Sequence, residues 1–348
     1  MRPLRAPIAA ILTGCAVLVG MVGVPGSASA AAQVTCTEAD VPVSAVLLGQ
    51  IMHGQLCSPA SGGSKMVQVL LPGATFNRKY WDLPYEPDRY SYQRDMARNG
   101  LATFAVDELG VGQSSRPLSV LVTGAGQSSA VHQVVQALRV GKLGGTRFEK
   151  VVLVGHSAGS AIAVLEASAY HDVDGVVLTG MTHVPNAPVV IKDMALGLQP
   201  VTLDPQLAKR GGDPGYLTSR PGDRDEMYFS STDVEPGVVQ ADEMVAKDQV
   251  SLSSLPEIIG LGLASPISRG ISAPVLLVNG TKDTGFCGLV RDCSTAESLR
   301  AAESMYFGPA AKLSVYVLPG AGHAVALAEN APDYRDVTRG WLRQYVGV

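Results

Sequence analysis

The sequence has 348 residues, enough for one large domain with an insertion or for two small domains. Charged residues make up only 17% of the chain and the formal net charge is −4, so no electrostatic pattern favours nucleic acid or acidic lipid as a partner. The 38 glycines and 22 prolines form no low-complexity run and no internal repeat, and they indicate many tight turns between short elements.

The N-terminal residues have the features of a secretory signal. Arg2 and Arg5 precede an apolar run over residues 8–24, and Ala28-Ser29-Ala30 provides a small-x-small cleavage site. We expect residues 1–30 to be a signal peptide that is cleaved near Ala30. The mature protein is then secreted, with no attachment to a membrane.

The leader resembles two other kinds of N-terminal segment. A membrane anchor is disfavoured because the apolar run is short for a spanning helix and is followed by the helix breakers Pro25 and Gly26. Residues 12–15 resemble a lipoprotein signal, but the apolar run continues well past Cys15.

Four cysteines remain after removal of the leader. An even number in an exported chain favours two disulfides, and of the three possible pairings sequence proximity favours Cys36–Cys57 and Cys287–Cys293. There is no C-x-x-C pair and no cluster of histidines in the sequence. We therefore expect neither a metal nor a cofactor.

The rest of the chain alternates strand and helix patterns. Strands are expected at residues 41–48, 51–56, 66–71, 102–106, 150–154, 175–179, 274–279 and 313–318. Helical patterns are expected at residues 90–99, 131–138, 158–165, 299–306 and 337–345. This alternation predicts an α/β fold with a mostly parallel central sheet that helices cover on both faces.

One long segment breaks the alternation. Residues 184–273 contain no strong strand run, and their two helix candidates are residues 189–198 and 238–247. So long a segment between two sheet strands predicts an inserted helical lid over the carboxyl ends of the strands. A second folding domain is the alternative, but the segment has few apolar residues for a core of its own. The core then consists of residues 31–183 and 274–348.

The strongest motif is Gly155-His156-Ser157-Ala158-Gly159. It joins a short apolar strand to a helix, and the G-x-S-x-G pattern is typical of a sharp turn that exposes the serine hydroxyl above the sheet. Because Ala158 opens the helix, its free N–H favours negative charge at the group that Ser157 attacks.

A serine nucleophile needs a base and a group that orients the base. Asp283 follows the strand at 274–279, and His323 follows the strand at 313–318, which gives the order serine, aspartate, histidine. We expect Ser157, Asp283 and His323 to be catalytic. Asp107 and Asp292 are the rival acids, but the first belongs to a turn and the second to the small disulfide loop.

With these residues the chain resembles the α/β-hydrolase fold family, from about Gln33 to the C-terminus. Residues 107–114, Asp-Glu-Leu-Gly-Val-Gly-Gln-Ser, are similar to the D-x-x-G-x-G-x-S turn of that family. The resemblance implies a serine hydrolase with a Ser-Asp-His triad. Because members include esterases, lipases, lactonases and peptidases, it indicates the mechanism better than the substrate.

The same resemblance places the oxyanion hole. The family commonly has His-Gly after its third strand, whereas this chain has Pro72-Gly73, so we expect the backbone N–H groups of Ala74 and Ala158 to form the hole. Residues that we expect to contact the substrate, with core packing as the alternative, are Thr75, Phe76, His156, His183 and Phe286.

The sequence thus predicts a secreted serine hydrolase that cleaves a carboxylic ester or lactone of a moderately apolar small molecule through an acyl-enzyme. A peptidase or amidase, or an acyl-transferring or cyclising enzyme, can use the same triad. A non-catalytic binder of a hydrophobic ligand is the alternative of another class. The oligomeric state is not indicated by the sequence.

Overall fold

The computed structural model of the protein describes residues 33–230, 233–288 and 290–347. The signal peptide expected at residues 1–30 lies outside the described residues. Among the described helices, none combines the length and the apolar character needed to cross a membrane.

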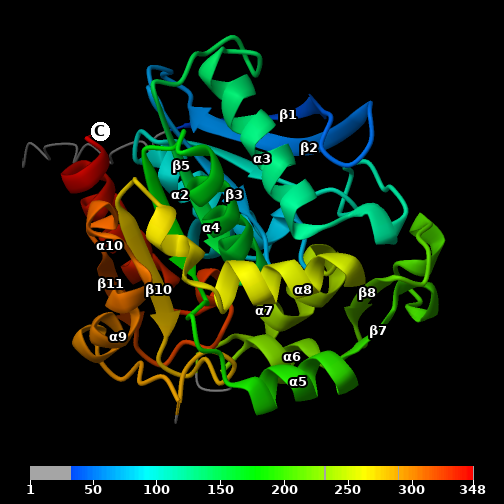
Figure 1. The fold of residues 1–348 in the computed structure, drawn as a ribbon. Helices are drawn as coiled ribbons and strands as arrows, with labels where there is room; N and C mark the ends of the chain where they lie inside the picture. The colour runs from blue at the N-terminus through cyan, green and yellow to red at the C-terminus, as the bar shows by residue number, and fades with distance from the viewer. Residues whose placement is uncertain (1–32, 231–232, 289, 348) are drawn as a thin grey trace, which may run out of the picture. The chain divides into compact units, whose positions relative to one another are not determined.

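The central element is an eight-stranded sheet with the order β1-β2-β4-β3-β5-β6-β10-β11 (Figure 1). From β4 to β11 all neighbours are parallel, and only β2 runs against both of its neighbours. The strands are β1 Val34–Val43, β2 Gln50–Pro59, β3 Met66–Leu71, β4 Ala102–Val106, β5 Lys150–His156, β6 Gly175–Thr179, β10 Val275–Gly280 and β11 Ser314–Leu318.

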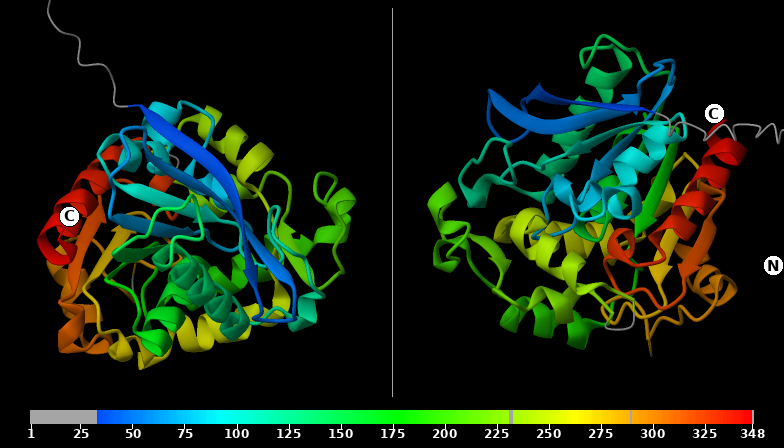
Figure 2. Two further views of the ribbon diagram at one scale, coloured as in Figure 1. Left: turned by 90° about the horizontal axis from the view of Figure 1, so that it is seen from above. Right: turned by 180° about the vertical axis from the view of Figure 1, so that it is seen from behind.

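Helices cover both faces of this sheet (Figures 1 and 2). Val151 and Leu153 of β5 pack with α3 and α4 in one buried cluster, whereas Val152 and Val154 pack with α2 and α10 in the other. The helices of the core are α1 Pro87–Tyr90, α2 Tyr92–Arg98, α3 Gly124–Arg139, α4 Ala158–Tyr170, α9 Ala296–Glu303 and α10 Ala331–Trp341. The predicted fold class is confirmed.

The first strand differs from its predicted position. β1 occupies residues 34–43 rather than 41–48, and Cys36 lies directly opposite Cys57 of β2, to which a disulfide joins it. Because β1 is an edge strand with most of its side chains at least partly exposed, it carries polar residues and shows no apolar run.

The segment 184–273 combines short helices with a small antiparallel sheet of order β7-β8-β9. Its elements are α5 Ala187–Leu196, β7 Leu198–Pro200, β8 Tyr216–Ser219, α6 Arg224–Tyr228, α7 Pro236–Ala241, β9 Val250–Ser251 and α8 Leu255–Glu257. The three strands have only two to four residues each, too few to give a periodic pattern. Ile258 and Leu263 belong to the same buried cluster as α4. That the segment acts as a lid stays a prediction.

Two glycines allow α4 to begin directly beside the sheet. A Cβ atom on Gly159 would lie 2.3 Å from the carbonyl oxygen of Pro72, and one on Gly155 would lie 2.4 Å from the carbonyl oxygen of Gly159. Both contacts are with backbone, which cannot move aside as a side chain does. Any larger residue at either position would therefore push the first turn of α4 away from β3.

The loop after β4 is a tight, buried turn. The Asp107 carboxylate accepts hydrogen bonds from the backbone N–H groups of Arg78 and Gln113. Glu108 beside it is also buried, and burial together with the charge of Asp107 raises the pKa of Glu108 to about 8. At neutral pH the folded protein therefore holds Glu108 in its neutral form.

Gly159→Ala is expected to lower the free energy of unfolding by about 3 kcal/mol, because the new methyl group collides with the Pro72 carbonyl. Gly340→Ala is the matched control. Gly340 lies exposed in α10 with no atom within 4 Å of an added Cβ, so this change should stabilise the protein by up to about 1 kcal/mol. Urea unfolding measures both values. Equal effects of the two substitutions would contradict the argument.

Glu108→Gln is expected to make the folded state less sensitive to alkaline pH. The folded pKa of Glu108 lies above its ordinary value of 4.5, so its contribution to stability is complete below that pH and is lost as the pH rises through about 8. The melting temperature of the variant relative to that of the wild type should therefore rise as the pH increases from about 5 to about 9. A gap that stays constant over this range would show that Glu108 does not titrate this way.

Candidate active site

Ser157 occupies the turn between β5 and α4. Its backbone has φ 52° and ψ −115°, a conformation that non-glycine residues adopt only when their surroundings enforce it. Its N–H donates to the carbonyl oxygen of Thr179 at 2.8 Å, which ties the turn to the end of β6. The next residue, Ala158, opens α4, and a first helical residue has no partner for its N–H in a preceding turn.

Asp283 and His323 come from the loops after β10 and β11. His323 Nδ1 and Asp283 Oδ2 are 2.8 Å apart, and both side chains are buried. The other carboxylate oxygen, Oδ1, accepts from the N–H groups of Gly285 and Phe286 at 3.1 Å each. These bonds fix the carboxylate, which in turn fixes the imidazole ring.

The three residues line one cavity of about 130 Å³. Ala74, Thr75 and Ala158 also line it, and the charged side chain of Asp193 reaches its wall. Most of the remaining wall is apolar and comes from residues 184–273, with Val190, Met194, Leu198, Met227, Val250, Leu255, Ile258, Ile259 and Leu263. The structure thus brings together the three predicted catalytic side chains and both predicted oxyanion residues.

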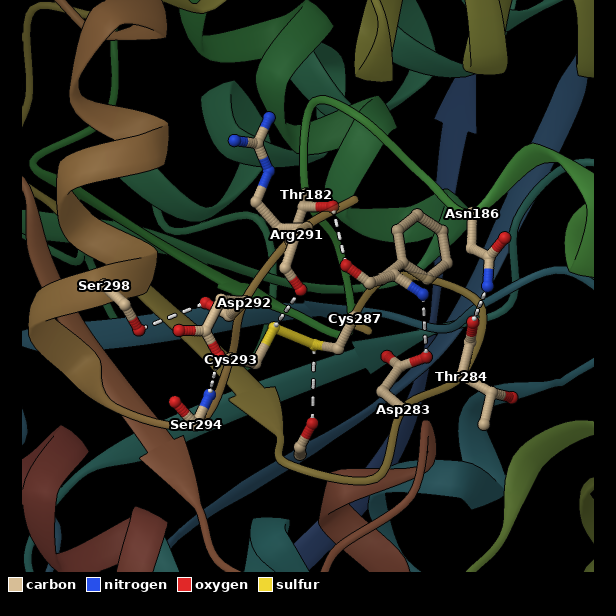
Figure 3. Close-up of a disulfide and its surroundings, with 12 residues drawn as sticks. Thr182, Asn186, Asp283, Thr284, Cys287, Arg291, Asp292, Cys293, Ser294 and Ser298 are labelled. Carbon is tan, nitrogen blue, oxygen red and sulfur yellow. Dashed lines mark hydrogen bonds between the residues drawn. A yellow bond between two sulfur atoms is a disulfide. The ribbon is translucent and has the colours of Figure 1, made fainter. Parts of the chain in front are cut away.

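A disulfide closes the loop that follows Asp283 (Figure 3). Cys287 is bonded to Cys293, and its backbone N–H donates to the carbonyl oxygen of Asp283 at 2.8 Å. Asp292, inside this small loop, is exposed and accepts from the N–H of Ser294. It does not line the cavity, and neither does Asp107, so the two rival acids stand apart from Ser157.

Of the five expected substrate contacts, Thr75 and Phe286 line the cavity. The Phe286 ring stacks on the imidazole of His323, with ring centres 5.2 Å apart. Phe76 is not part of the wall; it is buried against Tyr80 and Tyr228.

His156 also packs behind the site rather than in its wall. Its ring stacks on Tyr80 with centres 4.4 Å apart, and Nδ1 lies 3.2 Å from Thr179 Oγ1. Burial, and next the nearby His323, hold the pKa of His156 well below its ordinary value. His156 is therefore a neutral, structural ring at pH 7.

His183 has a structural role as well. Its Nδ1 is 2.6 Å from Glu303 Oε2, its Nε2 is 2.8 Å from Ser268 Oγ, and its ring stacks on Tyr306. The side chain is fully buried and does not line the cavity. Its position at the end of β6 predicts a substrate contact, but its side chain instead binds Glu303 at the end of α9.

Sequence reasoning missed Arg224 and Tyr228, which reach the predicted oxyanion loop, and Asp242, which holds Arg224. Arg224 is completely buried and pairs with Asp242 through two hydrogen bonds of 2.6 and 3.1 Å. Its third nitrogen donates to the carbonyl and hydroxyl oxygens of Thr75 at 3.0 and 3.1 Å. Tyr228 Oη lies 2.8 Å from the same hydroxyl. No motif surrounds these residues, and a lone arginine in a polar segment is usually exposed.

Thr75 is the residue that these contacts hold in place. Its backbone has φ 63°, in the left-handed region that a β-branched residue rarely adopts. The contacts with Arg224 and Tyr228 occupy its hydroxyl and carbonyl groups. The loop between Gly73 and Phe76 is thus shaped from outside by side chains of α6.

The sequence matches the model of a protein family, and the fold is similar to that of several solved structures. The model of the alpha/beta hydrolase family matches residues 68–336. An esterase from Thermogutta terrifontis is similar in structure, with a TM-score of 0.58 and 19% identity over 90% of this chain and 100% of that one. So are an enol-lactonase from Burkholderia xenovorans, with a TM-score of 0.56 and 18% identity over 87% and 99%, and the carboxylesterase CesB from Bacillus subtilis, with 0.56 and 17% over 89% and 91%.

No curated protein matches the sequence significantly. The solved structures are all less than 25% identical to this chain and establish the fold, whereas the family model covers most of the sequence. Together with the sheet order and the elbow at Ser157, that match identifies the protein as a member of the alpha/beta hydrolase family.

Proposed function

We propose that the protein is a secreted serine hydrolase that cleaves a carboxylic ester or lactone of a moderately apolar small molecule through an acyl-enzyme intermediate. The observation that carries the proposal is the 2.8 Å contact of His323 with Asp283 at the cavity that Ser157 also lines. The esterases and the enol-lactonase among the similar structures support an ester as the substrate.

In the proposed mechanism the Ser157 hydroxyl attacks the ester carbonyl while His323 accepts its proton through Nε2. Asp283 accepts from Nδ1–H, holds the ring in the tautomer that leaves Nε2 free, and stabilises the imidazolium. The proton then passes to the leaving alcohol. Water attacks the acyl-enzyme by the same route in reverse, which releases the acid and restores Ser157.

The backbone N–H groups of Ala74 and Ala158 are the proposed oxyanion donors. Both residues line the cavity beside Ser157. We assign Arg224 as a positioning residue for this hole, because it binds the backbone carbonyl of Thr75, the neighbour of Ala74. Asp242 keeps the Arg224 guanidinium in place, and Thr75 is then an anchor of the loop rather than a donor to the substrate.

The cavity wall indicates the substrate class. Its lining is predominantly apolar, which favours a hydrocarbon acyl group. The one further charged residue, Asp193, disfavours a substrate that carries its own negative charge near this wall. The two disulfides support an oxidising, extracellular location for the mature chain.

A fluorophosphonate probe should label the folded, disulfide-intact protein at Ser157 and inactivate it, and Ser157→Ala should lose both labelling and hydrolysis of p-nitrophenyl esters. Asp283→Asn should lower kcat by about 10⁴, because the His323 tautomer is no longer fixed. Asp292→Asn, the matched control in the neighbouring loop, should keep full activity.

The same assay separates the competing functions. Faster cleavage of aminoacyl anilides than of esters would replace the esterase by a peptidase or amidase. Absence of labelling in intact protein would overturn the serine mechanism and leave a binder of hydrophobic ligands.

Arg224→Lys should lower kcat by about 10- to 100-fold with little change in KM, because the charge opposite Asp242 remains while the donors to Thr75 are misplaced. Glu226→Gln is the control: this exposed residue of the same helix pairs with Lys192 and with no other of the described residues, so kcat should not change. Steady-state kinetics with one ester measures both, and circular dichroism checks folding. A raised KM with an unchanged kcat would instead assign Arg224 to substrate binding.

A further inference from the structure

A second cluster of chemistry-bearing side chains lies between the neighbouring helices α3 and α4 (Figure 1). His132 belongs to α3, Glu166 to α4, and Asp172 follows the end of α4. His132 Nδ1 is 2.9 Å from Asp172 Oδ2 and 3.9 Å from Glu166 Oε1, and one ligand atom from each residue fits within 4.8 Å of the others. One imidazole and two carboxylates therefore meet at one point.

Asp172 Oδ2 accepts a hydrogen bond from Gln136 Nε2 at 2.5 Å, but four other polar atoms of this cluster lack hydrogen-bond partners among the described residues. The Glu166 side chain is fully buried, and neither of its oxygens has a hydrogen-bond partner among the described residues. The same holds for Asp172 Oδ1 and for His132 Nδ1, whose close approach to Asp172 is not aligned as a hydrogen bond. Buried polar groups of native proteins are almost always paired, so these four atoms call for a missing partner.

The local field favours a cation as that partner. Glu166 and Asp172 lie at the C-terminal end of α4, where the helix dipole is negative, and the last turn of α4 contains no lysine or arginine. Arg139 is close by, but its donors are committed to the carbonyl oxygens of Asp172 and Glu149 and to Asp174. A buried carboxylate without a hydrogen-bond partner at this position needs either a proton or a metal ion.

We propose that His132, Glu166 and Asp172 bind a divalent transition-metal ion, with Zn²⁺ as the best match. An imidazole nitrogen with two carboxylate oxygens suits Zn²⁺ or Co²⁺, whereas Ca²⁺ and Mg²⁺ prefer oxygen ligands alone. Tyr170 stacks on the His132 ring with centres 3.9 Å apart and holds it toward the carboxylates.

The site has a structural rather than a catalytic role. Glu166 is nine residues beyond Ser157, or about 13 Å along the axis of α4. A metal ion would clamp α3 to the far end of the helix that carries Ser157. The spacing of the three ligands in sequence matches no metal motif, which is why the sequence predicted no metal.

The test uses tag-free, disulfide-intact protein dialysed against a chelator. Isothermal titration with Zn²⁺ should give one site per chain, and saturating Zn²⁺ should raise the melting temperature by about 4 °C, with Ca²⁺ having no effect. Co²⁺ should give a visible absorption band. His132→Ala and Glu166→Gln should each lose the site, while ester hydrolysis of the chelated protein should be unchanged by the metal.

His171→Asn is the matched control, because His171 is exposed beside the cluster and asparagine tolerates its left-handed backbone. This variant should bind Zn²⁺ as the wild type does. Binding that survives His132→Ala and Glu166→Gln but disappears in His171→Asn would show adventitious surface binding and overturn the proposal. Absence of any Zn²⁺ or Co²⁺ effect, with Glu166→Gln stabilising the protein at alkaline pH, would show that a shared proton satisfies the carboxylates and would also overturn it.

Discussion

The closeness of α4 to the sheet is the constraint on which the site depends. Because Gly159 has no side chain, the first turn of α4 contacts the end of β3. Because Gly155 has none, the end of β5 packs directly against the backbone of the same turn. At this contact Ser157 adopts its unusual backbone conformation, and Ala158 opens α4 with an N–H that no preceding helical turn can bind. A strained residue persists only where its surroundings fix it, and here the surroundings are the rigid middle of a parallel sheet.

The remaining groups reach this point because parallel strands all end at one edge. β10 and β11 deliver Asp283 and His323, and β3 delivers Ala74. The insertion contributes from the other side, through the apolar wall and through Arg224, which shapes the loop at Thr75. One buried arginine thus joins the segment 184–273 to the loop at Thr75.

The sequence predicted the centre of the molecule better than its periphery. β3, β4 and β6 lie where their apolar runs placed them, and the alternation of strands and helices correctly predicted a mostly parallel sheet but not the order of its strands. Asp283 and His323 could be predicted from the sequence because each directly follows a strand that an apolar run defines. The edge strand β1 and the short strands of the insertion were missed or misplaced, since partial exposure and short length remove the periodic pattern.

Side-chain networks were the least predictable part. Arg224 and Asp242 are separated by a helix and a loop, and only tertiary packing pairs them and brings Arg224 to Thr75. His156 and His183 were candidates for substrate contacts because of their places beside strand ends, yet stacking on Tyr80 and Tyr306 turns both rings into the core. Residue type and position along a strand do not reveal which way a loop directs its side chain.

The bond between Cys287 and Cys293 has a consequence for how the protein matures. Gly285 and Phe286 donate their N–H groups to Asp283, and the residues directly after them form a covalent loop only when both thiols are oxidised. In a reducing compartment the same segment is held by hydrogen bonds alone, and the acid that orients His323 has a looser frame. A newly made chain would therefore gain the final rigidity of this segment only when its thiols are oxidised, which links the order around Asp283 to the redox state of its surroundings.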